Sequence, residues 1–286
     1  MARFDWYQAT VRAHPRVVID CLKAMGSRAV EEDCKKVPHG YAAGVRLVDA
    51  DGLLAQVWWG GTHLHPHAVI TGETAVSGAE LLRAHLPDHS VTRADVCIDY
   101  ADAGAYDRLQ GIALSVARDK GVKVGTAGDH LLTFKGRTCY LGAPSSHTRL
   151  RLYDKAEELR QKFANDLNRL LQVPDDLTRL ECQVRPQTPV AKLAASTVEP
   201  MALMGSAAWM RELMRQVADV ELLPFVAGQV WRQADDDRAY AAVLAQYGGL
   251  LRRVAGDLGG WDVLGLQLRD DLMQRDIDEQ RIKGRR

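Results

Sequence analysis

The chain has 286 residues, enough for one large domain or two modest ones. Its 37 basic and 37 acidic residues give a net charge of zero, which argues against a protein that coats nucleic acid through its overall charge. No apolar run has the length of a membrane span, and five widely separated cysteines favour reduced core thiols over disulfides or a zinc site. We therefore expect a cytoplasmic protein with no membrane partner.

The first part of the chain alternates strand and helix signals. Hydrophobic periodicity and turn residues predict the following elements in order: a strand over 4–11, a helix over 14–25, a hairpin of strands 41–48 and 53–59 that turns at Asp51-Gly52, a short strand over 68–71 and a helix over 77–86. This region, residues 1–88, forms the first half of the expected domain.

The same order of elements recurs over residues 89–190. The patterns predict a strand over 91–100, a helix over 106–120, a strand pair at 137–141 and 148–153, a helix over 156–171 and a strand over 177–185 that ends at Pro186. We therefore expect an α+β fold with antiparallel sheet or sheets in two related halves flanked by helices, spanning residues 1–190. From there on the spacing turns helical, which predicts a helical C-terminal region over 191–286.

Three strands of the second half have an unusual polar face. In R-L-R-L-Y-D-K, strict alternation places Arg149, Arg151, Tyr153 and Lys155 on one face of a single strand, with leucines on the other. Two further strands alternate in the same way, and their polar faces carry Arg93, Asp95, Cys97 and Asp99 in one case and Arg179, Glu181, Gln183 and Arg185 in the other. If the three strands share a sheet, one face combines carboxylates, guanidiniums, a lysine and a tyrosine.

That inventory fits metal-assisted phosphoryl transfer. Asp95, Asp99 and Glu181 offer the oxygen ligands that a hard divalent cation such as Mg²⁺ or Mn²⁺ prefers. Arginine and lysine hold phosphate oxygens, and nearby positive charge would assist Tyr153 as a nucleophile. Residues 131–153 contain no Asp or Glu, so Lys135 and Arg137 extend the basic surface.

A family resemblance agrees with this chemistry. The letters T-C-Y-L-G at 138–142, then Ser145, then R-L-R-L-Y-D-K at 149–155 resemble the T-x-Y-x-G…S…R-x-Y-x-K block of the Rep_trans family, the replication initiation factors of rolling-circle plasmids and filamentous phages. R-A-D-V-C-I-D at 93–99 and R-L-E at 179–181 resemble further strands of that family, in the same order. The match covers residues 90–190 well, and more loosely the opening Phe4-Asp5-Trp6.

The resemblance implies an enzyme that nicks one DNA strand at an origin, stays joined to the 5′ phosphate through tyrosine and later rejoins the strand. Tyr153 matches the nucleophile, the three carboxylates match the acidic positions, and the residues that match phosphate-holding positions are Arg149, Arg151, Lys155 and Arg179. Tyr140 is a second phenol that we expect to contact DNA, and it is a fallback nucleophile. Arg93, Lys135, Arg137, Ser145 and Arg185 complete the expected DNA contacts. The resemblance also implies a 3′ hydroxyl left for a host polymerase, and because the chain has no P-loop, a host helicase is an expected partner as well.

Several alternatives remain open at this stage. His63, His65 and His67 lie in an H-x-H-x-H run that offers a rival metal site, although Pro66 interrupts the strand they would need. A relaxase of a conjugative element would use the same chemistry, whereas a non-catalytic origin or operator binder would use the basic strands only to hold phosphates. The helical C-terminal region offers a dimer contact, a DNA-reading helix-turn-helix or plain packing.

Overall fold

A computed structural model describes residues 1–227 and 235–283 of the chain. Contacts between residues divide the chain into two compact units, residues 1–230 and 231–286. Within the described residues, no helix is both long and apolar enough to cross a membrane.

The first half of the first unit contains five strands and two helices. In chain order these are β1 (Arg3–Val11), α1 (Pro15–Lys23), β2 (Val30–Asp33), β3 (Ala43–Asp49), β4 (Gly52–Trp59), β5 (His67–Thr71) and α2 (Ala75–His85). Strand β2 was not predicted, because its sequence, V-E-E-D, is short, acidic and exposed at every position.

The second half has the same order of strands with two added helices before its last strand, and it continues with further helices. It contains β6 (His89–Tyr100), α3 (Ala105–Asp119), β7 (Val124–Ala127), β8 (Thr138–Leu141), β9 (Thr148–Asp154), α4 (Lys155–Lys162), α5 (Leu167–Leu170), β10 (Thr178–Val184), α6 (Pro189–Ala194), α7 (Pro200–Leu203) and α8 (Ala208–Ala218). The predicted helix over 156–171 is in fact two helices, because the side chain of Asp166 accepts a hydrogen bond from the Arg169 amide and starts α5 anew.

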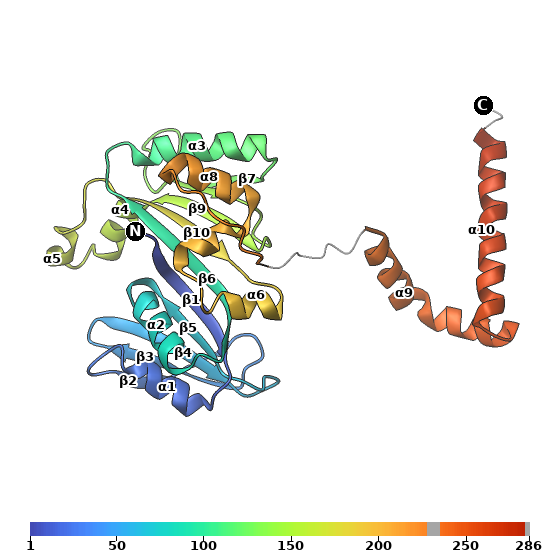
Figure 1. The fold of residues 1–286 in the computed structure, drawn as a ribbon, viewed down its shortest axis with the longest axis horizontal. Helices are drawn as coiled ribbons and strands as arrows, with labels where there is room; N and C mark the ends of the chain where they lie inside the picture. The colour runs from blue at the N-terminus through green and yellow to red at the C-terminus, as the bar shows by residue number, and fades with distance from the viewer. Residues whose placement is uncertain (228–234, 284–286) are drawn as a thin grey trace. The chain divides into compact units, whose positions relative to one another are not determined.

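The ten strands of the described residues form one antiparallel sheet in the order β2-β3-β4-β5-β1-β6-β10-β9-β8-β7. The first five strands in that order come from the first half of the chain, and the last five repeat their arrangement in reverse. Strands β1 and β6, each the first of its half, therefore pair at the centre of the sheet (Figure 1). The expected α+β fold in two related halves is confirmed, and so is the helical C-terminal region.

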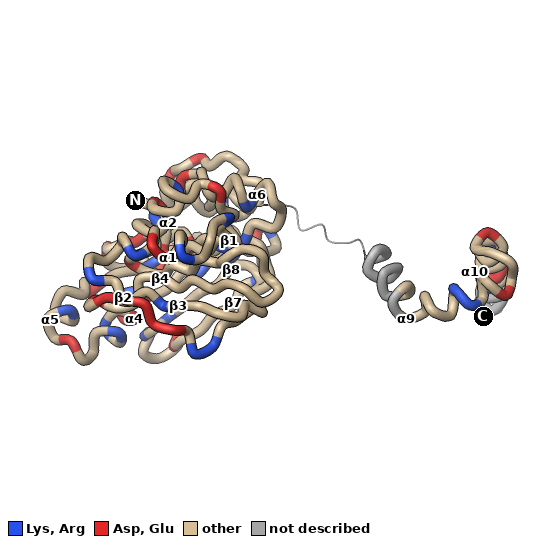
Figure 2. The backbone as a smooth tube through the Cα atoms, turned by 90° about the horizontal axis from the view of Figure 1, so that it is seen from below, with Lys and Arg blue, Asp and Glu red and all other residues tan. Residues whose placement is uncertain are grey.

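One face of this sheet carries the core. Alternate residues of the strands, such as Tyr7, Ala94 and Leu152, join a single buried cluster with residues of α1, α2, α3 and α8. We call the opposite face the open face. Figure 2 shows acidic and basic residues interspersed over the first unit, in keeping with the zero net charge.

The segment after β10 belongs to this core. Ala195, Leu203, Met204 and Met210 are fully buried in the cluster, and the Ala227 carbonyl accepts a hydrogen bond from the Gln187 amide. The second unit consists of α9 (Asp235–Leu258) and α10 (Trp261–Lys283). The predicted domain boundary at residue 190, between the α+β domain and the helical C-terminal region, stays a prediction.

Candidate active site on the open face

The register of β6, β10, β9 and β8 aligns the polar residues in three rows across the open face. One row contains Asp99, Arg179, Tyr153 and Thr138; the next contains Cys97, Glu181, Arg151 and Tyr140; the third contains Asp95, Gln183 and Arg149. Because side chains alternate along a strand, all three rows point to the same side of the sheet. Residues that are up to 88 positions apart in the chain, such as Asp95 and Gln183, thus lie on one surface.

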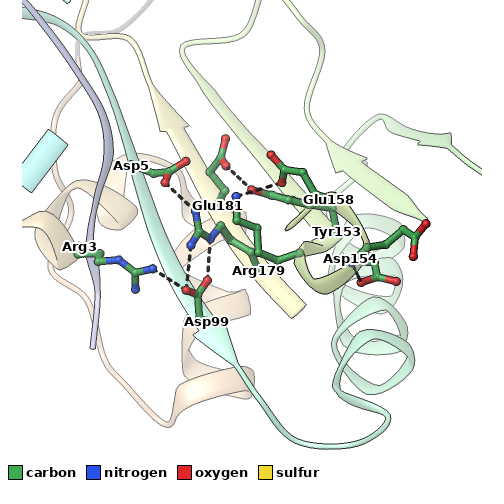
Figure 3. A network of polar contacts seen from close by, with 10 residues as sticks. Arg3, Asp5, Asp99, Tyr153, Asp154, Glu158, Arg179 and Glu181 are labelled. Atoms are coloured by element: carbon green, nitrogen blue, oxygen red, sulfur yellow. Dashed lines mark hydrogen bonds and ion pairs between the residues drawn. The ribbon is translucent and has the colours of Figure 1, made fainter. Parts of the chain in front are cut away.

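Tyr153 lies in the middle of this surface and is only 3% exposed. Its hydroxyl donates a hydrogen bond to Glu181 Oε2 at 3.4 Å (Figure 3). The Arg151 guanidinium carbon lies 3.8 Å from the ring centre, and Lys155 Nζ lies 5.7 Å from it. Burial, and then the charge of Glu181, raise the pKa of Tyr153, although Arg179 and Arg151 lower it. The cations expected to activate the phenol are present, but burial outweighs them in the resting protein.

Two arginines beside the tyrosines have no acidic partner. Arg151 stacks on Tyr153, and the Arg149 guanidinium carbon lies 4.1 Å from the ring centre of Tyr140. Within the described residues, neither guanidinium pairs with a carboxylate, and the Nε atom of each is buried without a hydrogen-bond partner. A buried donor without a partner is costly, so both groups are suited to an anionic ligand.

These arginines also line a hollow of about 180 Å³. Its wall is formed by Arg93, Tyr140, Arg149, Leu150, Arg151, Glu181 and Gln183. Tyr140 therefore faces the hollow directly, whereas Tyr153 lies beside it under the Arg151 side chain.

Arg179 organises the carboxylates at one end of the rows. Its Nε donates to Asp99 Oδ1 at 2.6 Å, its Nη2 donates to Asp99 Oδ2 at 2.9 Å, and its Nη1 donates to Asp5 Oδ1 at 2.6 Å (Figure 3). Asp99 also pairs with Arg3. Burial alone would raise the pKa of Asp99, but the hydrogen bonds from Arg179 and Arg3 lower it on balance. Asp99 is therefore held as a charged partner of two arginines.

Asp5 is the site residue whose role the motif analysis missed. The pairing of β1 with β6 shifts between Phe4 and Trp6, so Asp5 occupies a β-bulge without a partner residue. A bulge changes the direction of a side chain, and here it brings the carboxylate within hydrogen-bond distance of Arg179. Only the loose Phe4-Asp5-Trp6 resemblance hinted at this position, because a bulge has no local sequence signature.

Asp95 and Glu181 lie in adjacent rows and are both buried, at 2% and 8% exposed. Burial raises the pKa of Asp95, despite hydrogen bonds from Arg93. Burial together with the charges of Asp95 and Asp5 raises the pKa of Glu181 to about 7. Carboxylates that repel one another in a buried place suit a cation, and Mg²⁺ often takes only one or two protein carboxylates. Asp95 and Glu181 therefore suit such an ion, but Asp95 is paired with Arg93 just as Asp99 is paired with Arg179 and Arg3, so the metal role of all three carboxylates stays a prediction.

No group of three or more histidine, cysteine or acidic residues within the described residues could hold a metal by itself. His67 instead hydrogen-bonds to Gln8 and Thr10, and burial lowers its pKa to about 4. His63 stacks on Tyr41. The rival histidine site thus gains no support in this part of the chain.

Four expected phosphate contacts lie elsewhere. The prediction that Lys155 belongs to the strand is wrong, because Asp154 caps a helix that begins at Lys155, although the lysine stays near Tyr153 and pairs with Glu158. Arg137 points to the helix side, where it pairs with Asp107 and stacks on Tyr106. Lys135 is exposed in the loop before β8, and Ser145 is exposed in the turn between β8 and β9.

Arg93 and Arg185 border the same surface at its far end. Arg93 pairs with Asp95, and Arg185 Nη1 donates to the Pro144 carbonyl at 2.7 Å. Burial, followed by the charge of Arg93, lowers the pKa of Arg185, and Arg149 adds to this effect. Arg93, Arg149 and Arg185 therefore form a group of cations close enough to repel one another.

Comparisons with known proteins give a structural neighbour. A scan against protein-family models finds no match, and a search of curated proteins finds none either. Among solved structures, the chain is similar to the rolling circle replication initiator protein from Geobacillus stearothermophilus, with a TM-score of 0.51 and 17% sequence identity over 78% of this chain and 98% of that one. At this identity the likeness shows a shared fold.

Proposed function

We propose that this protein initiates rolling-circle replication by nicking one strand of DNA at an origin through Tyr153. The observation that carries the proposal is the surface around this residue: a tyrosine hydrogen-bonded to a carboxylate, beside two arginines that lack acidic partners, in a fold shared with a replication initiator. Phosphodiester cleavage needs this combination of nucleophile, proton acceptor and phosphate-holding cations.

The chemistry would be a transesterification. The Tyr153 oxygen attacks phosphorus, the bond from phosphorus to the 3′ oxygen breaks, and the new bond leaves the 5′ phosphate on tyrosine. The phenol proton passes to Glu181 through their hydrogen bond. The leaving 3′ oxygen gains a proton and becomes a hydroxyl. Rejoining runs the same steps in reverse.

Arg149 and Arg151 would bind the phosphate from its two sides. Because Arg151 covers the Tyr153 ring, a phosphate that attracts this guanidinium would also uncover the nucleophile. Asp95 and Glu181 would hold Mg²⁺ or Mn²⁺, which when bound supplies positive charge against the phosphate. The 3′ hydroxyl would serve a host polymerase, and strand opening would need a host helicase.

The test is adduct formation. The protein is incubated with supercoiled DNA of its own replicon, or with a single-stranded oligonucleotide library, in Mn²⁺ or in EDTA, and is analysed on a denaturing gel. We expect a metal-dependent protein–DNA adduct that Tyr153→Phe abolishes and Tyr140→Phe retains. Loss of the adduct only in Tyr140→Phe would move the nucleophile to Tyr140, the residue that lines the hollow. DNA binding without any adduct would indicate a non-catalytic origin binder instead.

A further inference from the structure

The open face continues past the candidate active site into the first half of the sheet. There it carries Trp6, Gln8 and Thr10 on β1, His67 on β5 and Trp58 on β4, and the strand register aligns Thr10 with His67 and His67 with Trp58. This half has no counterpart of the arginine and tyrosine rows. Its open face carries aromatic rings around His67 instead, and Arg46 on β3 pairs there with Glu32 on β2.

The aromatic residues there stack on one another. The Tyr41 and His63 rings lie 3.9 Å apart between centres, His67 lies 5.8 Å from Tyr41, and Trp58 lies 5.8 Å from His67. His67 and Trp58 are buried, Tyr41 is half-buried and His63 is exposed. The buried pair therefore supports two rings that reach solvent. Burial lowers the pKa of His67 to about 4, so this ring is neutral near pH 7.

Side-chain contacts connect this cluster to the active site without a break. Gln8 Nε2 donates to His67 Nε2 at 2.7 Å, and Trp6 Nε1 donates to Gln8 Oε1 at 3.1 Å. The Arg93 guanidinium carbon lies 4.1 Å from the Trp6 ring centre, and Arg93 pairs with Asp95. We call Trp6, Gln8, Tyr41, Trp58, His63 and His67 the aromatic ladder.

The ladder has the chemistry of a surface for unpaired bases. Successive bases stack on aromatic rings whatever their sequence, and an amide such as that of Gln8 offers both a donor and an acceptor to base edges. None of the six ladder residues is acidic, so none repels phosphate. From β9 to β4 the sheet crosses five strand spacings, or roughly 24 Å. That span suits a few nucleotides of extended single strand.

We infer that the aromatic ladder binds unpaired bases of the DNA strand that flanks the scissile phosphate. The inference rests on the proposed function for the location of that phosphate. The second half of the sheet then supplies phosphate contacts and chemistry, while the first half holds neighbouring bases by stacking. Trp6 lies at the junction, because Arg93 connects it to the carboxylates of the site.

The test measures binding without cleavage. A fluorescein-labelled oligothymidylate of twelve nucleotides is titrated with full-length Tyr153→Phe protein in EDTA, at several salt concentrations, and anisotropy gives Kd. Adding Trp6→Ala or His63→Ala should weaken binding about 5- to 100-fold, the range for loss of a base–aromatic stack. The slope of log Kd against log salt should not change, because no phosphate contact is lost. Arg149→Ala should lower that slope.

Matched controls separate stacking from general damage. Phe134→Ala removes an aromatic side chain that is 52% exposed but lies outside the ladder, next to Arg137 on the helix side, and should leave Kd unchanged. Tyr41→Phe should bind normally, whereas Tyr41→Ala should not. Binding to a twelve-base-pair duplex should be the same for all ladder variants.

Unchanged oligothymidylate affinity in Trp6→Ala and His63→Ala would overturn the inference. So would an altered salt slope, or an equal loss of duplex binding. The adduct assay on protein with Tyr153 intact reports separately on the proposed function: a missing adduct contradicts nicking, whereas a normal adduct with unaffected ladder variants contradicts only the ladder.

Discussion

Glu181 and Tyr153 share a hydrogen bond in a setting that disfavours the charged form of both side chains. The folded protein therefore holds a neutral phenol beside a carboxyl group whose pKa is raised to about 7. Neither property can be read from the alternating pattern of the strands, because both depend on how deeply the open face is covered by its own arginine side chains.

We expect Glu181 to lower the free energy of unfolding as the pH rises. Because its folded pKa of about 7 exceeds its ordinary value of 4.5, the folded state binds the proton more tightly, and stability falls as pH rises between these values. Glu181→Gln removes this fall. Relative to the wild type, the free energy of unfolding of Glu181→Gln should be higher by up to about 3 kcal/mol at pH 8 and nearly equal at pH 4.5, as measured by chemical denaturation. Glu212→Gln, whose carboxyl has a lowered pKa through Arg215, should gain nothing over this range. A pH-independent difference for Glu181→Gln would contradict the prediction.

Arg179 should contribute to the free energy of unfolding through its buried ion pairs. It is 5% exposed and pairs with both Asp99 and Asp5, so Arg179→Ala leaves two carboxylates short of their partner. We expect a loss of about 3–5 kcal/mol in the free energy of unfolding, measured with urea. Arg12→Ala breaks the exposed pair with Asp88 and should cost less than about 1 kcal/mol. Equal losses in the two variants would contradict the assigned role of burial.

At the scale of elements, the sequence predicted what local periodicity encodes. The alternation of β6, β9 and β10 gave the correct faces, and the fold class followed from the repeated order of elements. The predicted helix start at residue 156 lies one residue after the observed start at Lys155, where the Asp154 side chain caps the helix. The bulge at Asp5 and the pairing of Asp99 with Arg179 could not be predicted, because both depend on strands that are distant in the chain.

Helix α4 starts where strand β9 ends, and the N-cap of this helix sets the position of Lys155. The Asp154 side chain accepts a hydrogen bond from the Glu157 amide at 2.9 Å. Asp154→Ala should cost about 0.5–2 kcal/mol and slow adduct formation, and Asp154→Asn should restore both because asparagine also caps helices. Asp166→Ala removes the equivalent cap of α5 and should cost stability without slowing the adduct. Slow adduct formation in Asp166→Ala would point to a general loss of structure.

At the scale of the whole molecule, the two halves of the sheet share one arrangement but differ in chemistry. The second half carries the tyrosines, the arginines without acidic partners and most of the carboxylates, whereas the first half carries the aromatic ladder. The central pair β1 and β6 joins them, and Asp5 on β1 reaches Arg179 across that pair. The two halves thus combine one repeated fold with two different surfaces, which under our proposals bind the same single strand of DNA.

The limits of the folding unit can be tested by shortening the chain. Residues 195–214 contribute Ala195, Leu203, Met204, Met210, Leu213 and Met214 to the buried cluster, and Ala227 closes it with a hydrogen bond to Gln187. Among residues 243–244 and 246–275 of the second unit, whose side chains the structure describes, the buried hydrophobic ones are Ala255 and Leu264. A chain that ends at Ala227 should therefore melt cooperatively, with a Tm within a few degrees of the full chain, when followed by circular dichroism. A chain that ends at Val190 loses seven side chains of the core cluster, several of them worth about 2–5 kcal/mol each, and should show no cooperative transition. Cooperative melting of the shorter chain would instead support the boundary at residue 190 and would make α6, α7 and α8 an appendage of the sheet.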